Sequence, residues 1–229
     1  MKVYAMSDIH GYLQEFEKSL SRVDLSGDNK LVLLGDYIHG PDSYGVLDRI
    51  IKLQNEYGVE KVVALLGNHE EVALNGTWAI CEDCFGIAND GFDEEKEDLY
   101  LRWMANLPLH HEIGNAIFVH AGIDEEAAAE GYWELGTDEH FYTSKFPAET
   151  GKIKNFDIKI VAGHVGTNNI SGDPHFHDIF FDGGSHYYID GSVQKSGEIP
   201  VIMYDTEGDN FYQVTNSGAW IILPYYEGN

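Results

Sequence analysis

Short, mostly apolar runs recur along the chain, and a polar residue follows each of them within two positions. The runs comprise residues 3–6, 31–34, 62–66, 116–119 and 158–162. The residue that follows is in each case Asp, Asn or His. Runs of this length that are bounded by small residues are typical of strands buried on both faces of a sheet. The pattern therefore predicts five buried strands that each deliver a polar side chain to their carboxyl end.

Helical periodicity fills the gaps between the first three runs. Apolar residues at positions 13, 16, 20 and 23 predict an amphipathic helix over 13–23, and a similar spacing predicts another over 44–57. Strands that alternate with helices are typical of βαβ units, in which ligands gather beyond the carboxyl ends of the strands. The region 176–214 instead contains several strand-like runs in succession. We expect an α/β fold with a second, more antiparallel sheet packed on the first.

The polar residues at the strand ends form a set of candidate metal ligands. Carboxylates, imidazoles and an amide suit Mn²⁺, Fe or Zn²⁺, and the lack of a thiolate disfavours softer metals. Six protein ligands are too many for one open catalytic ion, but they fit two ions that share a bridging carboxylate. Two such ions clamp the oxygens of an in-line displacement at phosphorus and lower the pKa of a bound water. The candidate ligands are Asp8, His10, Asp36, Asn68, His120 and His164.

Each of these motifs has a simpler explanation when it is taken alone. A D-x-H-G sequence or a G-D pair after a strand can be an ordinary turn. A single buried histidine is more often a core residue than a ligand. These explanations fail jointly, because five similar strand ends would then have to coincide by accident. The combined pattern favours one shared site.

The motifs at the strand ends resemble those of a known family. They are S-D-I-H-G at 7–11, G-D-Y at 35–37, G-N-H-E at 67–70, F-V-H-A-G-I at 118–123 and G-H at 163–164. In order and spacing they are similar to the calcineurin-like metallophosphoesterases, most of all the branch of the phosphoprotein phosphatases and the bacterial diadenosine tetraphosphatases. The resemblance runs from Val3 to about Val214. It implies a four-layer α/β/β/α sandwich with a dinuclear metal centre.

The resemblance also implies a role for each motif residue. His69 would be the general acid that protonates the leaving alkoxide, and a water between the metal ions would be the nucleophile. Asp36 would bridge the two ions, so His69 and Asp36 are the expected catalytic residues. The remaining ligands would divide between the two ions, with Asp8 and His10 on the first and Asn68, His120 and His164 on the second.

The second motif departs from the family pattern G-D-x-x-D-R-G. Residues 35–41 here are G-D-Y-I-H-G-P, which is one residue short. The missing positions are an Asp that orients the general acid and an Arg that grips the phosphate, and His39 can replace only one of them. A second phosphate-binding Arg is also missing from the stretch in which Lys145 lies. His39 and Lys145 are therefore the candidate substrate-binding residues, although lysine lacks the bidentate grip of a guanidinium.

These features predict a metal-dependent phosphohydrolase. The main expectation is phosphomonoester hydrolysis like that of the serine/threonine protein phosphatases, by a hydroxide that bridges the metal ions. Because monoester dianions depend most on arginine contacts, the missing arginines leave a dinucleoside polyphosphate or phosphodiester hydrolase as the alternative. A catalytically impaired, metal-binding pseudo-enzyme is the second alternative. The presence of His69 disfavours it, since a binding module has no need of a general acid.

Length and charge limit the remaining classes. The chain has 229 residues, which suits a single domain over 1–229 with recognition insertions near 76–107, including a helix over 94–107, and near 124–154. Acidic residues outnumber basic ones 39 to 14, so neither a nucleic-acid polymer nor a membrane is expected as a partner. The expected partner is a phosphorylated substrate, either a phosphoprotein or a nucleotide, and the oligomeric state stays open. The sequence shows no signal peptide, which predicts a cytoplasmic protein.

Overall fold

Six strands form the first sheet of the computed structural model, which describes residues 1–82 and 92–226. In order across the sheet they are β11 (Gly218–Ile221), β10 (Asn210–Thr215), β9 (Ile202–Asp205), β1 (Lys2–Met6), β2 (Lys30–Leu33) and β3 (Val62–Ala64). Strands β1, β2 and β3 are parallel to one another, whereas β9, β10 and β11 extend the sheet as antiparallel strands. The first three predicted strands therefore form the parallel half of this sheet.

Five strands form the second sheet. In order they are β4 (His110–Ile113), β5 (Ala116–Val119), β6 (Lys159–Ala162), β8 (His186–Tyr188) and β7 (Phe180–Phe181). The three central strands are parallel, and β4 and β7 are antiparallel edge strands. The expectation that region 176–214 forms its own antiparallel sheet is wrong. Strands β7 and β8 join β6, while β9 and β10 join β1, because strand partners are chosen by long-range packing that the local pattern does not carry.

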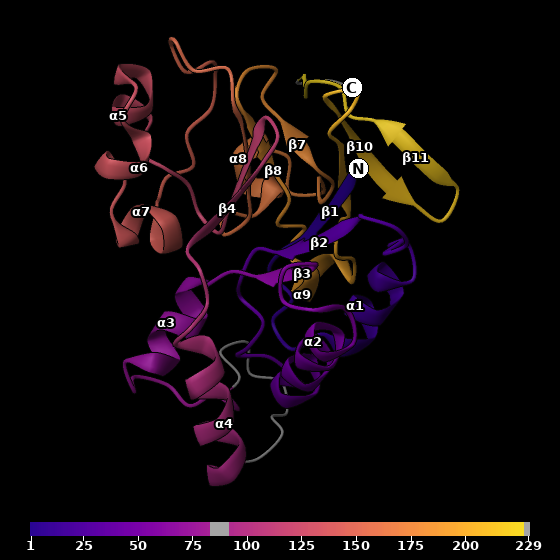
Figure 1. Ribbon diagram of the computed structural model, residues 1–229, viewed down its shortest axis with the longest axis vertical. Helices are drawn as coiled ribbons and strands as arrows, with labels where there is room; N and C mark the ends of the chain where they lie inside the picture. Colours follow the sequence, from indigo (N-terminus) through magenta and orange to yellow (C-terminus); the bar gives the residue numbers. More distant parts are fainter. Residues whose placement is uncertain (83–91, 227–229) are drawn as a thin grey trace.

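The two sheets pack face to face around a buried apolar layer, as Figure 1 shows. Strand β1 illustrates the division, because successive side chains of a strand point to opposite faces. Val3 and Ala5 pack between the sheets in one cluster with Phe118 of the second sheet. Tyr4 and Met6 face away from the second sheet and pack in the other direction. Both faces of β1 are therefore buried, as its uninterrupted apolar run predicts.

Helices α1 (Leu13–Leu20) and α2 (Ser43–Tyr57) cover the outer face of the first sheet. Phe16 of α1 and Leu47 of α2 pack in the same cluster as Leu33 of β2. The start of α2 is fixed by Asp42, whose carboxylate accepts a hydrogen bond from the backbone N–H of Gly45 at 2.9 Å. Both predicted helices exist, although the first ends at Leu20 rather than at position 23.

Three short helices cover the outer face of the second sheet. They are α5 (Glu125–Glu130), α6 (Trp133–Gly136) and α7 (Glu139–Ser144). Ala128, Trp133 and Tyr142 from these helices pack in one cluster with Ile117 and Val119 of β5. Helices, two sheets and helices thus follow one another, which confirms the predicted α/β/β/α arrangement.

The remaining helices are α3 (Asn68–Leu74), α4 (Glu94–Met104), α8 (Thr167–Ser171) and α9 (Val193–Ser196). Helix α4 confirms the helix that the sequence predicts over 94–107. It lies in the first expected insertion, of which residues 83–91 are outside the described part of the chain. The second expected insertion contains α5, α6 and α7. Within residues 1–82 and 92–226, no helix is both long and apolar enough to span a membrane.

Candidate metal and catalytic site

Sharp backbone turns bring the residues at the strand ends together. Asp8, Asp36 and His164 have left-handed backbones, with φ of 54°, 56° and 63°. Residues other than glycine rarely occupy this region, so the surrounding structure holds them there. Glycines let the backbone approach the carboxylates of Asp36 and Asp8 closely, because a side chain at these positions would clash with them. A Cβ on Gly67 would lie 2.3 Å from Oδ1 of Asp36, and a Cβ on Gly163 would lie 2.2 Å from Oδ2 of Asp8.

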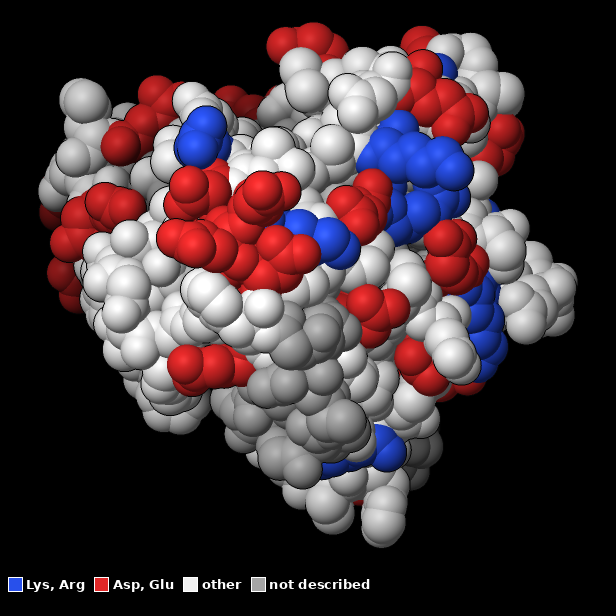
Figure 2. All heavy atoms as spheres, turned by 90° about the horizontal axis from the view of Figure 1, so that it is seen from below, with Lys and Arg blue, Asp and Glu red and all other residues white. Residues whose placement is uncertain are grey.

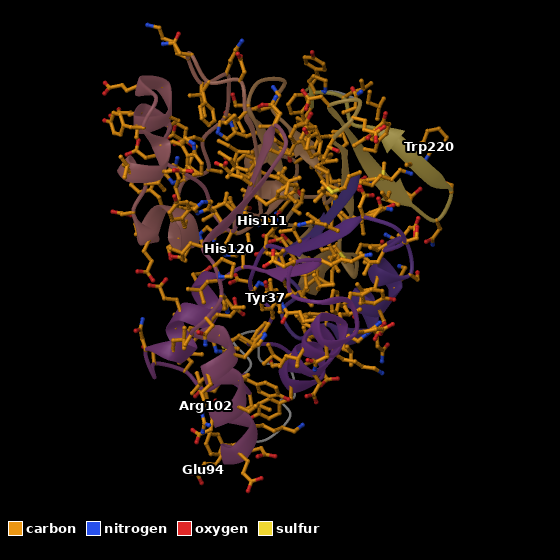
Figure 3. All side chains as sticks on the ribbon, in the orientation of Figure 1. Tyr37, Glu94, Arg102, His111, His120 and Trp220 are labelled. Atoms are coloured by element: carbon orange, nitrogen blue, oxygen red, sulfur yellow. The ribbon has the colours of Figure 1, made fainter. Side chains whose placement is uncertain are left out.

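Asp36 lies at the centre of the site, surrounded by imidazoles. Its Oδ1 is 3.4 Å from Nε2 of His120, and its Oδ2 is 3.8 Å from Nε2 of His10 and 3.9 Å from Nε2 of His69. Burial raises the pKa of Asp36, but His120 and His69 outweigh burial and hold this pKa well below its usual range. Burial likewise lowers the pKa of His120, yet the Asp36 carboxylate raises it to about 9. His120, at the end of β5, is labelled in Figure 3.

The side chain of Asn68 joins the two sheets at this point. Its Oδ1 lies 3.0 Å from Nε2 of His120 and 2.9 Å from Nδ1 of His164. Asp8 completes the group, because its Oδ2 accepts a hydrogen bond from the backbone N–H of His164 at 3.0 Å. The structure thus brings together all six predicted ligands, although their role as ligands stays a prediction. We call these residues the ligand cluster: Asp8, His10, Asp36, Asn68, His120 and His164.

The charges of the ligand cluster fit a bound divalent cation. Burial, together with the nearby carboxylates of Asp190 and Asp36, raises the pKa of Asp8 well above its usual range. The neighbouring His120 therefore compensates only part of this negative charge. Burial also lowers the pKa of His10 and of His164 to about 4, which keeps both imidazoles in the neutral, metal-binding form. The donor atoms of Asp36, His120 and His164 lie within 4.8 Å of one another, a spacing that one metal ion can span.

Glu70 holds the backbone of the site through hydrogen bonds, although the sequence pattern predicts no functional role for it. Its fully buried carboxylate accepts hydrogen bonds from the backbone N–H groups of Asp36 at 2.8 Å, Tyr37 at 2.8 Å and Gly67 at 3.1 Å. Burial and the charge of Asp36 raise the pKa of Glu70 to about 7. A local signal was available, because Glu70 stands three residues after Gly67, the residue that precedes α3, and a Glu at this position is typical of a capping box.

His39 lies against the expected general acid. Its Nδ1 is 2.9 Å from Nδ1 of His69, and its side chain is fully buried. Burial, with a contribution from His69, lowers the pKa of His39 to about 4, so the His39 ring is neutral. A neutral imidazole can accept a hydrogen bond from His69, as the Asp missing from the second motif would do. The structure therefore brings His39 to His69, whereas the sequence predicts it as a substrate contact.

Lys145 lies apart from the ligand cluster. Its ammonium group donates a hydrogen bond to the carbonyl of Ile123 at 2.8 Å and forms an ion pair with the carboxylate of Glu125. The residue is buried against the helices that cover the second sheet. The structure does not bring this candidate substrate-binding residue to the site.

The ligand cluster opens into a pocket of about 410 Å³. This volume lies in the range of small-molecule sites. Asp36 and His69 line this pocket. Trp78, Lys195 and residues of the segments that follow β6 and β8 line it as well. The sequence pattern does not place Trp78 or Lys195 at the site, because neither residue lies in a motif. Only the fold brings Trp78, in the loop after α3, and Lys195, in α9, together.

The fold and the ligand cluster fit the class of the metallophosphoesterases, and the family comparison agrees. The sequence profile of the calcineurin-like phosphoesterases matches residues 1–200, which is most of the chain. The chain belongs to the calcineurin-like phosphoesterase family.

Several curated relatives are named bis(5'-nucleosyl)-tetraphosphatase, symmetrical. The protein from Nitrosospira multiformis is 34% identical over 131 residues, which covers 54% of this chain and 44% of the relative. The protein from Methylococcus capsulatus is 33% identical over 131 residues, covering 54% and 44%. The one from Delftia acidovorans is 28% identical over 151 residues, covering 61% and 51%. The matches span about half the length of these relatives.

Solved structures share the fold at low sequence identity. A cold-active protein-tyrosine phosphatase from a Shewanella species superposes with a TM-score of 0.63 at 14% identity, covering 97% of this chain and 80% of that one. A protein serine/threonine phosphatase from Saccharomyces cerevisiae superposes with a TM-score of 0.59 at 14% identity, covering 100% and 81%. At such identities the likeness shows the fold alone.

Proposed function

We propose that this protein hydrolyses a phosphoanhydride bond of dinucleoside polyphosphates. The observation that carries the proposal is the ligand cluster, of which five of the six residues line a pocket of about 410 Å³. The names of the curated relatives support a nucleotide substrate rather than the phosphoprotein that the main expectation favoured.

The composition of the pocket also supports an anhydride substrate. Within the described residues, no arginine lines this pocket. Phosphomonoester dianions depend strongly on the bidentate contacts that a guanidinium provides. A phosphoanhydride carries less charge on the reacting phosphorus, so its hydrolysis depends less on such contacts. Symmetrical cleavage of a tetraphosphate would yield two nucleoside diphosphates.

The ligand cluster would hold two divalent ions of the Mn, Fe or Zn type, with Asp36 between them. When bound, these ions would activate a water and stabilise the negative charge on the phosphoryl oxygens. The donor set of carboxylates, imidazoles and one amide suits such ions. Glu70 supports the arrangement by holding the backbone of Asp36 and Tyr37.

His69 would supply the proton for the leaving group. Its side chain lines the pocket and is 18% exposed, so a substrate oxygen can reach it. Because Nδ1 of His69 contacts Nδ1 of His39, its Nε2 stays on the side of Asp36. This geometry points one nitrogen at the reaction centre and anchors the other in the protein. General acid catalysis of this kind contributes about 10²–10⁴-fold to the rate.

The test compares two substrates on Mn²⁺-reconstituted protein. We expect diadenosine tetraphosphate to be hydrolysed to two molecules of ADP, and a serine phosphopeptide to react far more slowly. Asp36→Asn is the control, because it removes the bridging carboxylate while it conserves size. Hydrolysis of the phosphopeptide without hydrolysis of the dinucleotide would overturn the proposal and restore the protein phosphatase.

A further inference from the structure

Two side chains on the rim of the pocket have no part in the ligand cluster. Trp78 follows α3 and is 43% exposed, although it is a large aromatic residue. Lys195 belongs to the short helix α9, which follows β8 in the chain. Both line the same pocket as Asp36 and His69. The pocket therefore offers one open aromatic surface and one positive charge beside the predicted reaction centre.

The indole of Trp78 packs against His39, which in turn contacts His69, the expected general acid. Its ring centroid is 5.6 Å from that of His39, with the two planes at 83°. The His39 ring in turn contacts His69 at 2.9 Å. Two other tryptophans, Trp103 and Trp133, pack against hydrophobic clusters. Trp78 differs from these two, because it exposes much of its surface at a functional pocket.

Lys195 is the cation that an anionic ligand meets in this pocket. It is the one lysine among the described residues that line the pocket, and its charge acts there on the carboxylate of Asp190. The arginines are engaged elsewhere, since Arg22 lies 3.5 Å from Glu198 and Arg49 2.6 Å from Glu17. The chain carries a formal charge of −25, and acidic side chains are spread over the face shown in Figure 2. In so acidic a chain, a lysine that lines the pocket is therefore significant for binding an anion.

We propose that this rim is a nucleotide subsite, in which Trp78 stacks on a nucleobase and Lys195 binds the phosphate groups beyond the reacting one. The proposal rests on the proposed function and names the part of the pocket that selects the substrate. Every nucleobase has a flat π face, so stacking on an indole binds it without regard to its identity. Lysine binds phosphate as a point charge, which suits a flexible polyphosphate chain.

A nucleotide matches this rim better than a phosphopeptide does. Phosphoserine and phosphothreonine carry no ring that could use the face of Trp78. Phosphotyrosine carries a ring, but its single phosphate would be at the ligand cluster, which leaves Lys195 without a partner. A nucleoside polyphosphate supplies both a ring and further phosphates. The two features together therefore favour the nucleotide.

The test measures binding rather than turnover. Isothermal titration calorimetry on Mn²⁺-loaded protein gives the Kd of ADP, which has a base, and of pyrophosphate, which has none. We expect Trp78→Ala to raise the Kd of ADP about 10-fold and that of pyrophosphate less than about twofold, whereas Trp78→Phe retains most of the affinity. We expect Lys195→Gln to weaken both probes by a similar factor, because both carry the phosphates.

Matched controls use the same residue types elsewhere. Trp220→Ala removes a tryptophan that is 60% exposed on β11, which Figure 3 shows well away from His120. Lys152→Gln removes an exposed lysine that does not line the pocket. Neither control variant should change the Kd of either probe.

Three results would overturn the inference. In the first, Trp78→Ala leaves the Kd of ADP unchanged. In the second, Trp78→Ala weakens the binding of ADP and of pyrophosphate equally, which would mean that Trp78 acts through His39 and not by stacking on a base. In the third, Trp78→Ala weakens the binding of a phosphotyrosine peptide but not that of ADP. The proposed function fails separately. Loss of ADP affinity in Trp78→Ala, in a protein that does not hydrolyse diadenosine tetraphosphate, would support the subsite and overturn the proposed reaction.

Discussion

Two buried groups of charged side chains in this protein behave in opposite ways. In the ligand cluster and beside it, burial raises the pKa of Asp8 well above its usual range and that of Asp190 to about 6. The second group, which we call the ion-pair cluster, lies between the second sheet and its covering helices. It consists of Glu125, Lys145, Asp182 and His186.

The carboxylates of the ion-pair cluster are compensated by the chain itself. Nδ1 of His186 lies 2.8 Å from Oδ2 of Asp182, and its Nε2 lies 3.4 Å from Oε1 of Glu125. Burial raises the pKa of Glu125 and of Asp182. The contacts of Glu125 with His186 and Lys145, and the hydrogen bond between His186 and Asp182, outweigh burial and lower both pKa values. The chain itself therefore supplies the cations that balance the ion-pair cluster, whereas at Asp8 and Asp190 burial outweighs the nearby His120, as expected for carboxylates that take up a metal ion. This difference separates a structural group from a functional one.

The largest expected effect comes from Asp36→Asn. The change removes the negative charge at the centre of the ligand cluster, so we expect both turnover and the bound metal to be lost. Metal content by mass spectrometry and hydrolysis of diadenosine tetraphosphate measure the two losses. Full activity in this variant would contradict the dinuclear site.

His69→Ala is expected to lower kcat about 10²–10⁴-fold, the usual contribution of a general acid. The bound metal should stay constant, because the imidazole is not among the predicted ligands. The assay therefore pairs steady-state kinetics with metal analysis. Loss of metal in this variant would mean that His69 is a ligand rather than an acid.

Lys145→Met tests the ion-pair cluster and the sequence prediction for this lysine together. Removing one partner of a buried ion pair leaves Glu125 without its lysine, so we expect the free energy of unfolding to fall by about 3–5 kcal/mol. We expect kcat and KM on folded protein to stay close to wild type, since the side chain lies outside the pocket. A raised KM with unchanged stability would instead support the predicted role in substrate binding.

The smallest effect is a pH dependence of stability that originates in the ion-pair cluster. Burial lowers the pKa of His186, but its hydrogen bond to Asp182 and its ion pair with Glu125 outweigh burial and raise this pKa above the unfolded value. Its contribution is therefore complete below about pH 6.5, the pKa of an unperturbed histidine, and is lost as the pH rises through the folded value. Thermal unfolding measures the Tm of wild type and of His186→Gln over a range of pH. We expect the Tm to fall less with rising pH in the variant than in wild type. Equal decreases in both would exclude His186 as the source.

The sequence predicts the strands that lead to the site because the information is local. A short apolar run followed by Asp, Asn or His specifies both a buried strand and the residue at its end, as at Asp36 and His164. The second sheet was predicted with the wrong strands, since the pairing of β8 with β6 depends on contacts between distant segments.

The rim of the pocket could not be predicted for the same reason. Trp78 and Lys195 lie more than a hundred positions apart and outside any motif, and only the folded chain places them in one pocket. His39 was predicted at the site from its motif, but its contact with His69 depends on the turn that gives His39 a left-handed backbone, with φ of 65°. Lys145 shows the opposite case, because nearness to a motif position did not bring it to the pocket.

The ligand cluster draws its residues from both sheets. Asp8, Asp36 and Asn68 follow strands of the first sheet, and His120 and His164 follow strands of the second. A cation shared among them would therefore fasten the two halves of the sandwich at one end, as a cross-link between segments that are far apart in the chain. A ligand that binds only the folded state stabilises it in proportion to the logarithm of its concentration. Chelation should accordingly lower the Tm of the whole domain and increase hydrogen exchange in β1 and β6 together.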